Sequence, residues 1–592
     1  MAARMTAKQK TKRLPAGSVR VKILPKDPLI ARTKDLWPRD DVVTSPTVAH
    51  GPTSARVAVI DYNADLDVRF APARLLRDGS GFRGIASFKR SRLLDDFAFH
   101  QVNVWAIIEQ TLGKLEDERA LARPIPWASG LGRLLVLPHA GYQENAFYDR
   151  STGALHFFYF QGPDGAPVYT CLSHDIITHE LGHAVLDGLK PCYNEVSSAE
   201  TAGFHEYFGD AMAMMTSLQT RDIALLVTKK APKRLDAKNL VSAIASEFGA
   251  AIHGIPDEDY LRGAWNKRTM SDMKGKYEEH DWSEILTGTY YDLLQYLYVR
   301  NQKDLEDDSP NGAGNGTGKA ARKGTIGQRQ NRSVRALMRA AGQTANVMLR
   351  AIDYCPPVDL RYDEYARALM RADEVAYPVD GYGIRAELER IFKRRGLNPR
   401  REEFEERAAI GRKLRQHEDS DGDIQAITAT PADAYRFVDK HRELFQIPYN
   451  ANLNVSSVYR TKKLAASGYR PPQEQIIEFT WSEDVRLQGK AFGSLSRTLL
   501  PLYCGGTLVF DSNGNFLHMA LVLPTAERKK SLLAYVKYLV REGELGITDG
   551  TRGIGAPGAG SYRISATIAG ERLCLQRNAA MRHRRHGVGH EQ

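Results

Sequence analysis

The spacing of apolar residues predicts a mixed first part of the chain and a mainly helical middle. Residues 94–117 repeat apolar side chains at helical intervals. Short runs with strand character surround this helix, at 55–63, 133–139, 145–149 and 154–160. From residue 174 onward helical patterns dominate, and they continue through 334–354. The order of these patterns indicates an α+β fold.

The pattern changes again after about residue 430. Residues 475–483 and 505–524 read as strands, and the second segment contains a hairpin turn at Asp511-Ser512-Asn513-Gly514. An amphipathic helix follows at 526–542. We therefore expect a small α/β accessory domain with a basic tail over 431–592, joined by a charged linker at 399–430.

Charge and composition predict that two segments of the chain do not contribute to a hydrophobic core. Residues 1–34 hold ten Lys and Arg against one Asp, so they carry +9 of the net charge of +11. We interpret 1–55 as a basic disordered tail, capable at most of weak contact with nucleic acid or an anionic surface. Residues 303–330 include a Gly- and Asn-rich stretch and are expected to be a flexible insertion.

The remaining composition is that of a globular protein. Hydrophobic residues make up 42% of 592, which is enough for more than one core. No apolar run of about 18 residues predicts a membrane span, and the N-terminus lacks the apolar stretch of a signal peptide. Five scattered cysteines show no disulfide framework. These features favour a cytoplasmic protein, with non-classical export left open.

The candidate chemistry begins in THELGHAVLDG, residues 178–188. His179 and His183 are four residues apart in a helical pattern, so both imidazoles lie on one face and can hold one Zn²⁺. Glu180 stands beside them and can accept a proton from a metal-bound water. This spacing predicts one catalytic zinc ion.

A catalytic zinc needs a third protein ligand and an open fourth position. The extension HExxHxxGxxH is absent here. A later amphipathic helix instead offers Glu206 and Asp210, which share a face because they are four residues apart. Glu206 would be the third ligand, and Asp210 would orient a ligand histidine by a hydrogen bond. Their apolar neighbours predict burial, where unpaired carboxylates are costly.

At these motifs the chain resembles the thermolysin family of zinc endopeptidases, which are gluzincins with HExxH followed by ExxxD. The resemblance implies a two-lobed zincin. A mixed N-terminal lobe over 56–190 would carry the active-site helix, and a mainly helical lobe over 191–398 would follow. It also implies peptide or protein substrates, hydrolysed by a metal-activated water with Glu180 as general base.

Further segments are similar to the same family. ENAFYD resembles the edge strand that binds the substrate backbone, which would involve Asn145, Ala146 and Tyr148. RTMSD resembles the segment that holds a substrate carbonyl, which points to Arg268. HDWSEILTGTYYDLL resembles the segment with the transition-state histidine, which points to His280.

The resemblance also implies an oxyanion tyrosine, and Tyr193 matches best. Its segment is longer than in thermolysin, so other tyrosines remain open as candidates: Tyr207, Tyr277 and Tyr290.

The chain departs from the family in several features, and two other functions stay open. We expect neither the family's signal sequence nor its long pro-region. The residues after Asp210 are poor in acids, so no double calcium site is expected. An aminopeptidase would need a carboxylate near zinc to bind the substrate amine, for which Glu200 is the candidate. A non-catalytic zinc-containing binding protein would have no use for Glu180 as a base.

Overall fold

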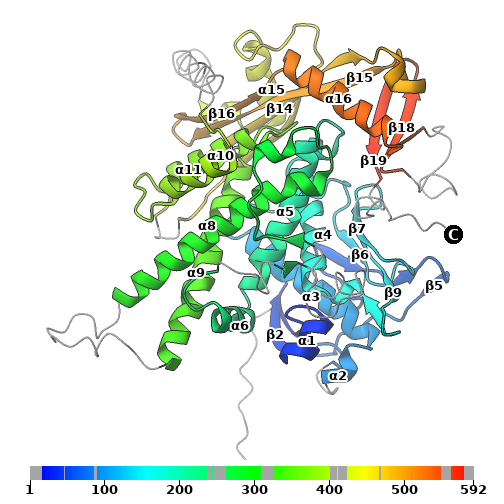
Figure 1. Cartoon of the computed structure of the whole chain (residues 1–592), viewed down its shortest axis with the longest axis vertical. Coiled ribbons are helices and arrows are strands. Elements are labelled where there is room, and N and C mark those ends of the chain that lie inside the picture. Colours follow the sequence, from blue (N-terminus) through cyan, green and yellow to red (C-terminus); the bar gives the residue numbers. More distant parts are fainter. Residues whose placement is uncertain are drawn as a thin grey trace, which may run out of the picture.

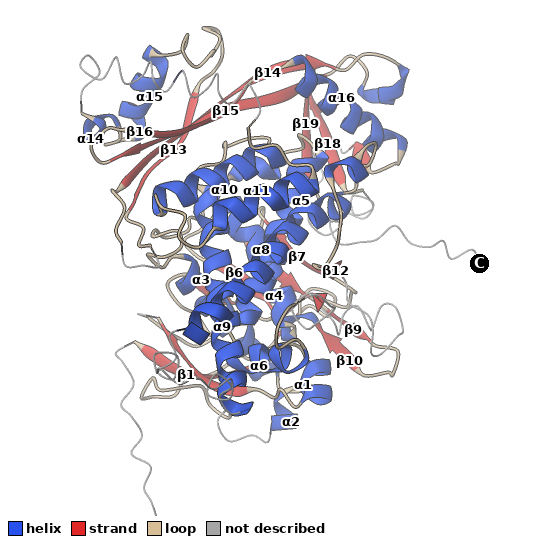
Figure 2. Cartoon of the chain, turned by 60° about the vertical axis from the view of Figure 1, so that its left-hand side comes forward, coloured by secondary structure: helices blue, strands red, loops and turns tan. Residues whose placement is uncertain are grey.

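We describe a computed structural model of the chain, which has an α+β architecture (Figures 1 and 2). The structure describes residues 17–45, 47–85, 90–235, 243–244, 262–307, 326–400, 410, 423–465, 469–547 and 562–578. Within these residues, no helix is long and apolar enough to cross a membrane.

A four-stranded sheet organises the N-terminal part. Its order is β3 (Val57–Val59), β6 (Leu134–Leu137), β8 (Ala154–Phe157) and β7 (Ala146–Asp149). β7 lies at the edge and runs antiparallel to β8, while the other neighbours are parallel. Two short pairs accompany this sheet: β4 (Tyr62–Asn63) with β5 (Val68–Arg69), and β9 (Tyr159–Gln161) with β10 (Pro167–Tyr169).

Helix α3 (Phe97–Leu115), preceded by the short α2 (Arg90–Leu93), confirms the predicted helix at 94–117. It begins where the Asp96 carboxylate accepts a hydrogen bond from the Phe99 amide at 2.9 Å, which is a typical N-cap. Its buried side chains include Trp105 and Ile108, which belong to the main hydrophobic core. The helix thereby forms a central support of this lobe.

The expectation of a disordered tail over 1–55 is wrong for the residues that the structure describes. β1 (Ser18–Ile23) pairs antiparallel with β2 (Arg39–Thr44), and α1 (Pro28–Lys34) lies between them. Val19, Val21 and Ile23 are buried in the main core. The basic residues conceal this alternation, because they occupy the positions between the buried ones. Residues 1–16 lie outside the described part.

Helices form the middle of the chain, as the periodicity predicts. The longer ones are α4 (His174–Leu189), α5 (Ala199–Leu218), α6 (Arg221–Lys230), α8 (Glu279–Asp307), α9 (Ile326–Ile352), α10 (Tyr362–Ala376) and α11 (Ile384–Arg395). Short elements complete this part: η1 (Thr170–Leu172), η2 (Pro191–Asn194), η3 (Met270–Met273), and β11 (Ala243–Ile244) paired with β12 (Arg262–Gly263).

The predicted insertion at 303–330 is too long. α8 extends to Asp307 and α9 begins at Ile326, so both ends of that range are helical. The Gly- and Asn-rich centre, 308–325, lies outside the described residues. The helical ends carry apolar residues that pack onto neighbouring helices, such as Leu305.

A seven-stranded sheet follows in the C-terminal part. Its strands are β13 (Asn454–Thr461), β14 (Glu474–Arg486), β15 (Leu499–Asp511), β16 (Phe516–Val522), β17 (Leu545–Ile547), β18 (Ile564–Ala569) and β19 (Arg572–Arg577). Its helical elements are α14 (Ile424–Ile427), α15 (Pro431–Lys440), η4 (Lys490–Leu495) and α16 (Ala526–Arg541). The expected hairpin joins β15 to β16, where Asp511 accepts hydrogen bonds from the amides of Asn513 and Asn515 at 2.9 Å.

The C-terminal sheet lies across the helical middle of the molecule (Figure 2). Buried ion pairs join the two parts, including Lys463 with Asp353 at 2.7 Å and Lys190 with Glu478. Val509 of β15 belongs to the main core. Most of the predicted linker, at 401–409 and 411–422, lies outside the described residues, as does the end of the chain at 579–592.

Candidate metal centre

Helix α4 presents the two histidines of the HELGH sequence on one face. The Ser173 hydroxyl accepts the amide of Ile176 at 3.5 Å and caps the helix, and every residue of α4 is buried. The Nε2 atoms of His179 and His183 are 3.1 Å apart. Two imidazole nitrogens at this separation face a common point.

Helix α5 brings the predicted third ligand to the same point. Glu206 Oε2 lies 3.5 Å from His179 Nε2, and Glu206 Oε1 lies 3.6 Å from His183 Nε2. Tetrahedral zinc with bonds of 2.0–2.1 Å would set its donor atoms about 3.3 Å apart. The separations between the two imidazole nitrogens and the two oxygens of Glu206 are close to this value, so the three side chains can hold one zinc ion.

Two glycines allow α4 and α5 to approach this closely. A Cβ atom added to Gly182 would lie 2.9 Å from the Cα of Gly209. A Cβ atom added to Gly209 would lie 2.6 Å from two atoms of the His179 ring. Both contacts are shorter than packed carbon atoms tolerate, so the absence of these side chains permits the position of Glu206.

The outer nitrogens of both histidines also have partners. His179 Nδ1 lies 3.1 Å from Asp210 Oδ1, which is the orienting contact that the sequence predicts. His183 Nδ1 lies 3.4 Å from the Nδ1 of His205, a residue that sequence reasoning did not select. The signal for His205 was its place directly before Glu206. With hydrogens on the outer nitrogens, both Nε2 atoms present lone pairs that could bind a metal.

Glu180 lies between the histidines and the edge strand. Its Oε2 atom accepts a hydrogen bond from the amide of Tyr148 at 3.1 Å. One carboxylate oxygen of Glu180 and one ring nitrogen each of His179 and His183 all lie within 4.8 Å of one another. The carboxylate is thus held beside the metal position.

The predicted substrate strand is β7, and it is an edge strand. The amide of Tyr148 points away from β8, because it donates to Glu180. Ala146 and Asn145 are buried at the start of this strand, and the Asn145 carbonyl accepts a hydrogen bond from the Thr170 hydroxyl at 3.4 Å. The strand therefore crosses the candidate site next to Glu180.

His280 reaches the centre from the first turn of α8. Its Nε2 atom lies 3.2 Å from Glu206 Oε2, and its Nδ1 atom lies 2.7 Å from Glu278 Oε1. Burial alone would lower the pKa of His280, yet Glu206 and Glu278 raise it to about 10. Burial alone would raise the pKa of Glu206, yet His280, His183 and His179 hold it well below its usual range.

The contacts of Tyr193 do not match the oxyanion role that the resemblance implies for it. Its ring is fully buried and its hydroxyl donates a hydrogen bond to the Pro356 carbonyl at 2.6 Å. The hydroxyl is therefore directed into the core, because η2 packs against the segment before α10. The alternative tyrosines have other contacts: Tyr207 bonds to Tyr365 at 3.1 Å, Tyr277 stacks on Tyr538, and Tyr290 is 1% exposed.

Arg268 lies beside α8. Its Nε atom donates to Glu284 Oε2 at 2.6 Å, one turn after His280. Its carbonyl accepts a hydrogen bond from Arg395 at 3.0 Å, which fixes the backbone of this segment. The side chain is 42% exposed, so a substrate carbonyl would have to compete with Glu284 for it.

The C-terminal sheet forms one wall next to the centre, which sequence patterns did not indicate. A cavity of about 240 Å³ is lined by residues 148–151, by Asn194, Glu195 and His205, and by residues 574–577 of β19. Arg577 forms an ion pair with Glu279 at 3.0 Å, directly before His280. Figure 1 shows β18 and β19 extending from the C-terminal sheet toward the side where β7 lies.

No family model matches the chain, and no curated protein matches it. The geometry of the site carries the functional argument alone.

Proposed function

We propose that the chain is a thermolysin-like zinc endopeptidase, with His179, His183 and Glu206 as the metal ligands. The convergence of these three donors, with separations of 3.1–3.6 Å, carries the proposal. Two nitrogens and one carboxylate are the ligand set of catalytic zinc sites that keep one position open. Zinc bound there would supply Lewis acidity, lowering the pKa of a water and polarising the scissile carbonyl.

The protein's own groups supply the proton transfer. Glu180 accepts the proton of the attacking water and delivers it to the leaving amine. The amide of Tyr148 holds the Glu180 carboxylate in place from 3.1 Å. No side-chain nucleophile is required in this scheme.

Charge stabilisation and substrate alignment come from neighbouring elements. His280, whose ring nitrogens lie 3.2 Å from Glu206 Oε2 and 2.7 Å from Glu278 Oε1, can donate a hydrogen bond to the developing oxyanion. The edge strand β7 offers backbone groups for pairing with an extended peptide. An edge strand can pair with peptide residues on both sides of a scissile bond, which favours endopeptidase activity.

The contacts of Glu200 weaken the aminopeptidase alternative. Its carboxylate accepts a hydrogen bond from the amide of Tyr362 at the start of α10. Burial raises the pKa of Glu200 to about 8. A protonated carboxyl group with a backbone partner is a poor binder for a substrate ammonium group.

A peptide library read by mass spectrometry tests the proposal. The full chain, the Glu180→Gln variant and a chelator-treated wild type would be compared, with Glu109→Gln as a control on α3. We expect internal cleavage by wild type and Glu109→Gln alone, and zinc retained in Glu180→Gln.

Other outcomes would overturn it. Cleavage confined to peptide N-termini would establish the trimming enzyme instead. Absence of cleavage with zinc bound at one or more ions per chain would favour the binding protein. More than a few per cent of wild-type turnover in Glu180→Gln would remove Glu180 from the role of base.

A further inference from the structure

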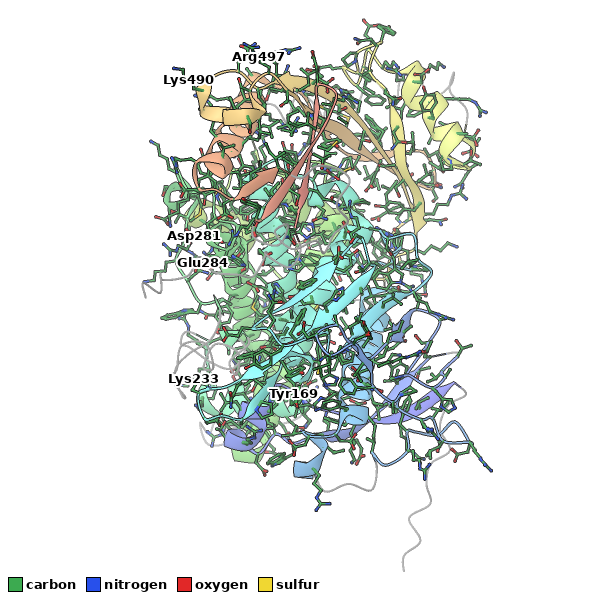
Figure 3. All side chains as sticks on the ribbon, turned by 90° about the vertical axis from the view of Figure 1, so that its right-hand side faces the viewer. Tyr169, Lys233, Asp281, Glu284, Lys490 and Arg497 are labelled. Carbon is green, nitrogen blue, oxygen red and sulfur yellow. The ribbon has the colours of Figure 1, made fainter. Side chains whose placement is uncertain are left out.

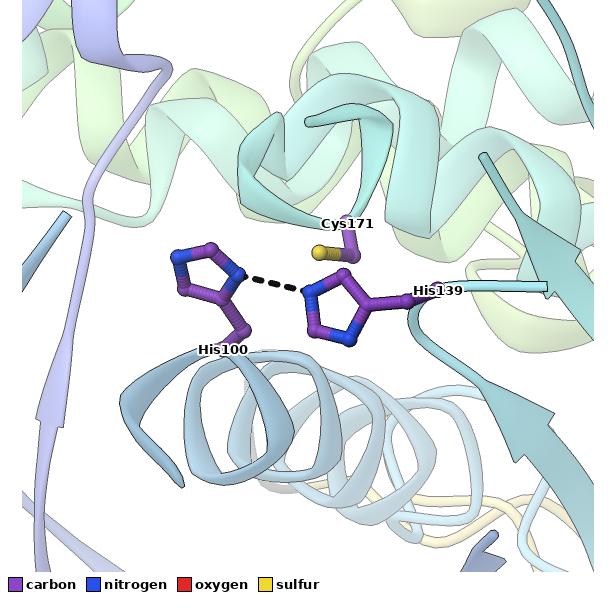
Figure 4. Close-up of side chains that lie close together, drawn as sticks. All are labelled: His100, His139 and Cys171. Atoms are coloured by element: carbon purple, nitrogen blue, oxygen red, sulfur yellow. Dashed lines mark hydrogen bonds between the residues drawn. The ribbon is translucent and has the colours of Figure 1, made fainter. Parts of the chain in front are cut away.

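A second group of metal-binding side chains lies in the core of the N-terminal lobe. His100 comes from the first turns of α3, His139 follows β6, and Cys171 belongs to η1. All three are 0% exposed, and one possible ligand atom from each lies within 4.8 Å of the others. Figure 4 shows the two rings joined by a hydrogen bond, with the Cys171 sulfur beside them.

This group is separate from the candidate active site. Tyr169, whose ring packs against His100 at 4.7 Å and His139 at 5.6 Å, marks its position in Figure 3. Asp281 and Glu284, which mark the start of α8 near His280, lie in a different part of the molecule in that view. Any ion in this group would be additional to the catalytic one.

The outer nitrogens of both histidines face acceptors. His100 Nε2 lies 2.9 Å from the Leu94 carbonyl, and His139 Nδ1 lies 2.9 and 3.0 Å from the two oxygens of Asp61. The Asp61 carboxylate also accepts a hydrogen bond from Gln101 at 2.7 Å. Carbonyl and carboxylate oxygens accept hydrogen bonds, so both outer nitrogens carry hydrogen.

The inner nitrogens then have an incompatible pairing. His100 Nδ1 and His139 Nε2 face each other at 2.8 Å. In two neutral rings with hydrogen on the outer nitrogens, both inner nitrogens present lone pairs. An additional proton or a metal ion is needed between them.

We propose that His100, His139 and Cys171 bind a second metal ion of the class that prefers imidazole and thiolate ligands, zinc or copper(I). Histidine ligands usually donate their outer N–H group to a carboxylate or a carbonyl, and Asp61 and Leu94 supply these two partners.

Binding changes protonation but transfers no electrons. The Cys171 thiol loses its proton to solvent, and the thiolate donates to the ion. The ring nitrogens need to separate from 2.8 Å to about 3.3 Å to place a tetrahedral ion between them.

The ion would stabilise the start of α4, the helix that carries His179 and His183. It would join α3 and the segment after β6 to η1, which ends one residue before the Ser173 cap of α4. Three elements that are far apart in the sequence would be fixed at one point. We infer that this ion is structural, because the group is fully buried and offers no path for a substrate.

Metal content and cobalt spectroscopy of the full chain test this site. Wild type is expected to bind two ions per chain, measured by mass spectrometry of the total metal. Cys171→Ser should lose one, and Glu206→Gln should weaken only the other. Cys355→Ser is the matched control, because Cys355 is also fully buried and lies away from this group.

Cobalt(II) identifies the ligands directly. A thiolate ligand gives cobalt a strong near-ultraviolet charge-transfer band, whereas the catalytic ligands His179, His183 and Glu206 contain no sulfur. We expect this band in wild type, Glu206→Gln and Cys355→Ser, and its loss in Cys171→Ser.

The wild-type spectrum is decisive even if a variant fails to fold. One ion per chain with no thiolate band would overturn the second site and indicate a proton shared by the two histidines. A thiolate band that persists in Cys171→Ser would also overturn it. Neither result bears on the catalytic ion, since peptide cleavage is measured separately.

Discussion

The lack of a side chain at Gly209 determines how closely α5 can approach His179, a proposed metal ligand on α4. Gly209 lies against the His179 ring, which has Glu206 on one nitrogen and Asp210 on the other. We predict that Gly209→Ala moves this ring or the helix and lowers zinc affinity by about 10- to 100-fold, the range for loss of supporting contacts. Competition with a chelator of known affinity measures the change.

Gly113→Ala is the matched control for this substitution. Gly113 also lies within a helix, but a Cβ atom there would meet nothing within 4 Å. The control should keep wild-type zinc affinity and stabilise α3 by about 0.5–1 kcal/mol. Equal zinc affinity in both variants would show that the approach of the two helices does not set the metal geometry.

At the scale of single residues, the environment of Glu200 predicts that folding stability depends on pH. Burial raises its pKa to about 8 from an ordinary value near 4.5. Its contribution to folding is fully present below about pH 4.5, where the group is protonated in both states. The contribution declines as pH rises toward 8, because the unfolded chain ionises first.

Glu200→Gln removes this dependence, since an amide has no proton to lose. The variant should gain on wild type by about 2 kcal/mol or more between pH 5 and pH 9. Denaturant unfolding at both pH values measures the gain, with the 56% exposed Glu118 changed to Gln as control. A constant difference across pH would mean that Glu200 is ionised in the folded protein.

At the scale of elements, the sequence predicted what local periodicity encodes. His179 with His183, and Glu206 with Asp210, are pairs four residues apart within single helices, so their common faces followed from helix geometry. The contact between these helices depends on Gly182 and Gly209, which no periodic pattern marks. The direction of Tyr193 depends on Pro356, a partner 163 residues away. Such contacts are decided by packing and stayed beyond prediction.

The N-terminal segment shows that charge composition also fails to predict which residues are buried. Lys26 lies in a segment whose composition is typical of a solvated tail. Its side chain is nevertheless only 2% exposed and forms an ion pair with Asp175 in the first turn of α4. Asp175 also accepts a hydrogen bond from Ser217 at 2.9 Å. A basic residue was counted as part of a tail, although it forms an ion pair at the start of α4, the helix that carries His179 and His183.

The ion pair between Lys26 and Asp175 leads to a prediction about the stability of the N-terminal elements. Lys26→Ala leaves the Asp175 carboxylate buried without its cation, and we expect a loss of about 3–5 kcal/mol in the free energy of unfolding. Lys22→Ala is the control, because its partner Asp40 is 87% exposed and such pairs contribute about 0–1 kcal/mol. Chemical denaturation separates the two, and a loss under 1 kcal/mol for Lys26→Ala would contradict a folded role for this segment.

At the scale of the whole molecule, buried ion pairs join the C-terminal sheet to the rest of the chain. Removal of the sheet would leave one partner of each pair without its opposite charge. Lys190 pairs with Glu478, Asp353 with Lys463, and Asp359 with Arg528. Each pair is buried, and each joins the helical part to a residue after 423. Loss of one partner from such a pair costs about 3–5 kcal/mol, and whole domains are stable by only about 5–15 kcal/mol.

We therefore predict that a chain ending at residue 422 does not fold, although it retains the proposed zinc ligands His179, His183 and Glu206. Circular dichroism and zinc binding would both show the loss, while the full chain retains them. Two substitutions in the full chain separate charge from truncation: Lys190→Ala should destabilise by about 3–5 kcal/mol, and Lys490→Ala, on the exposed surface of η4 (Figure 3), by under about 0.5 kcal/mol. Cooperative unfolding and full zinc affinity in the shortened chain would instead establish the sheet as an independent accessory domain.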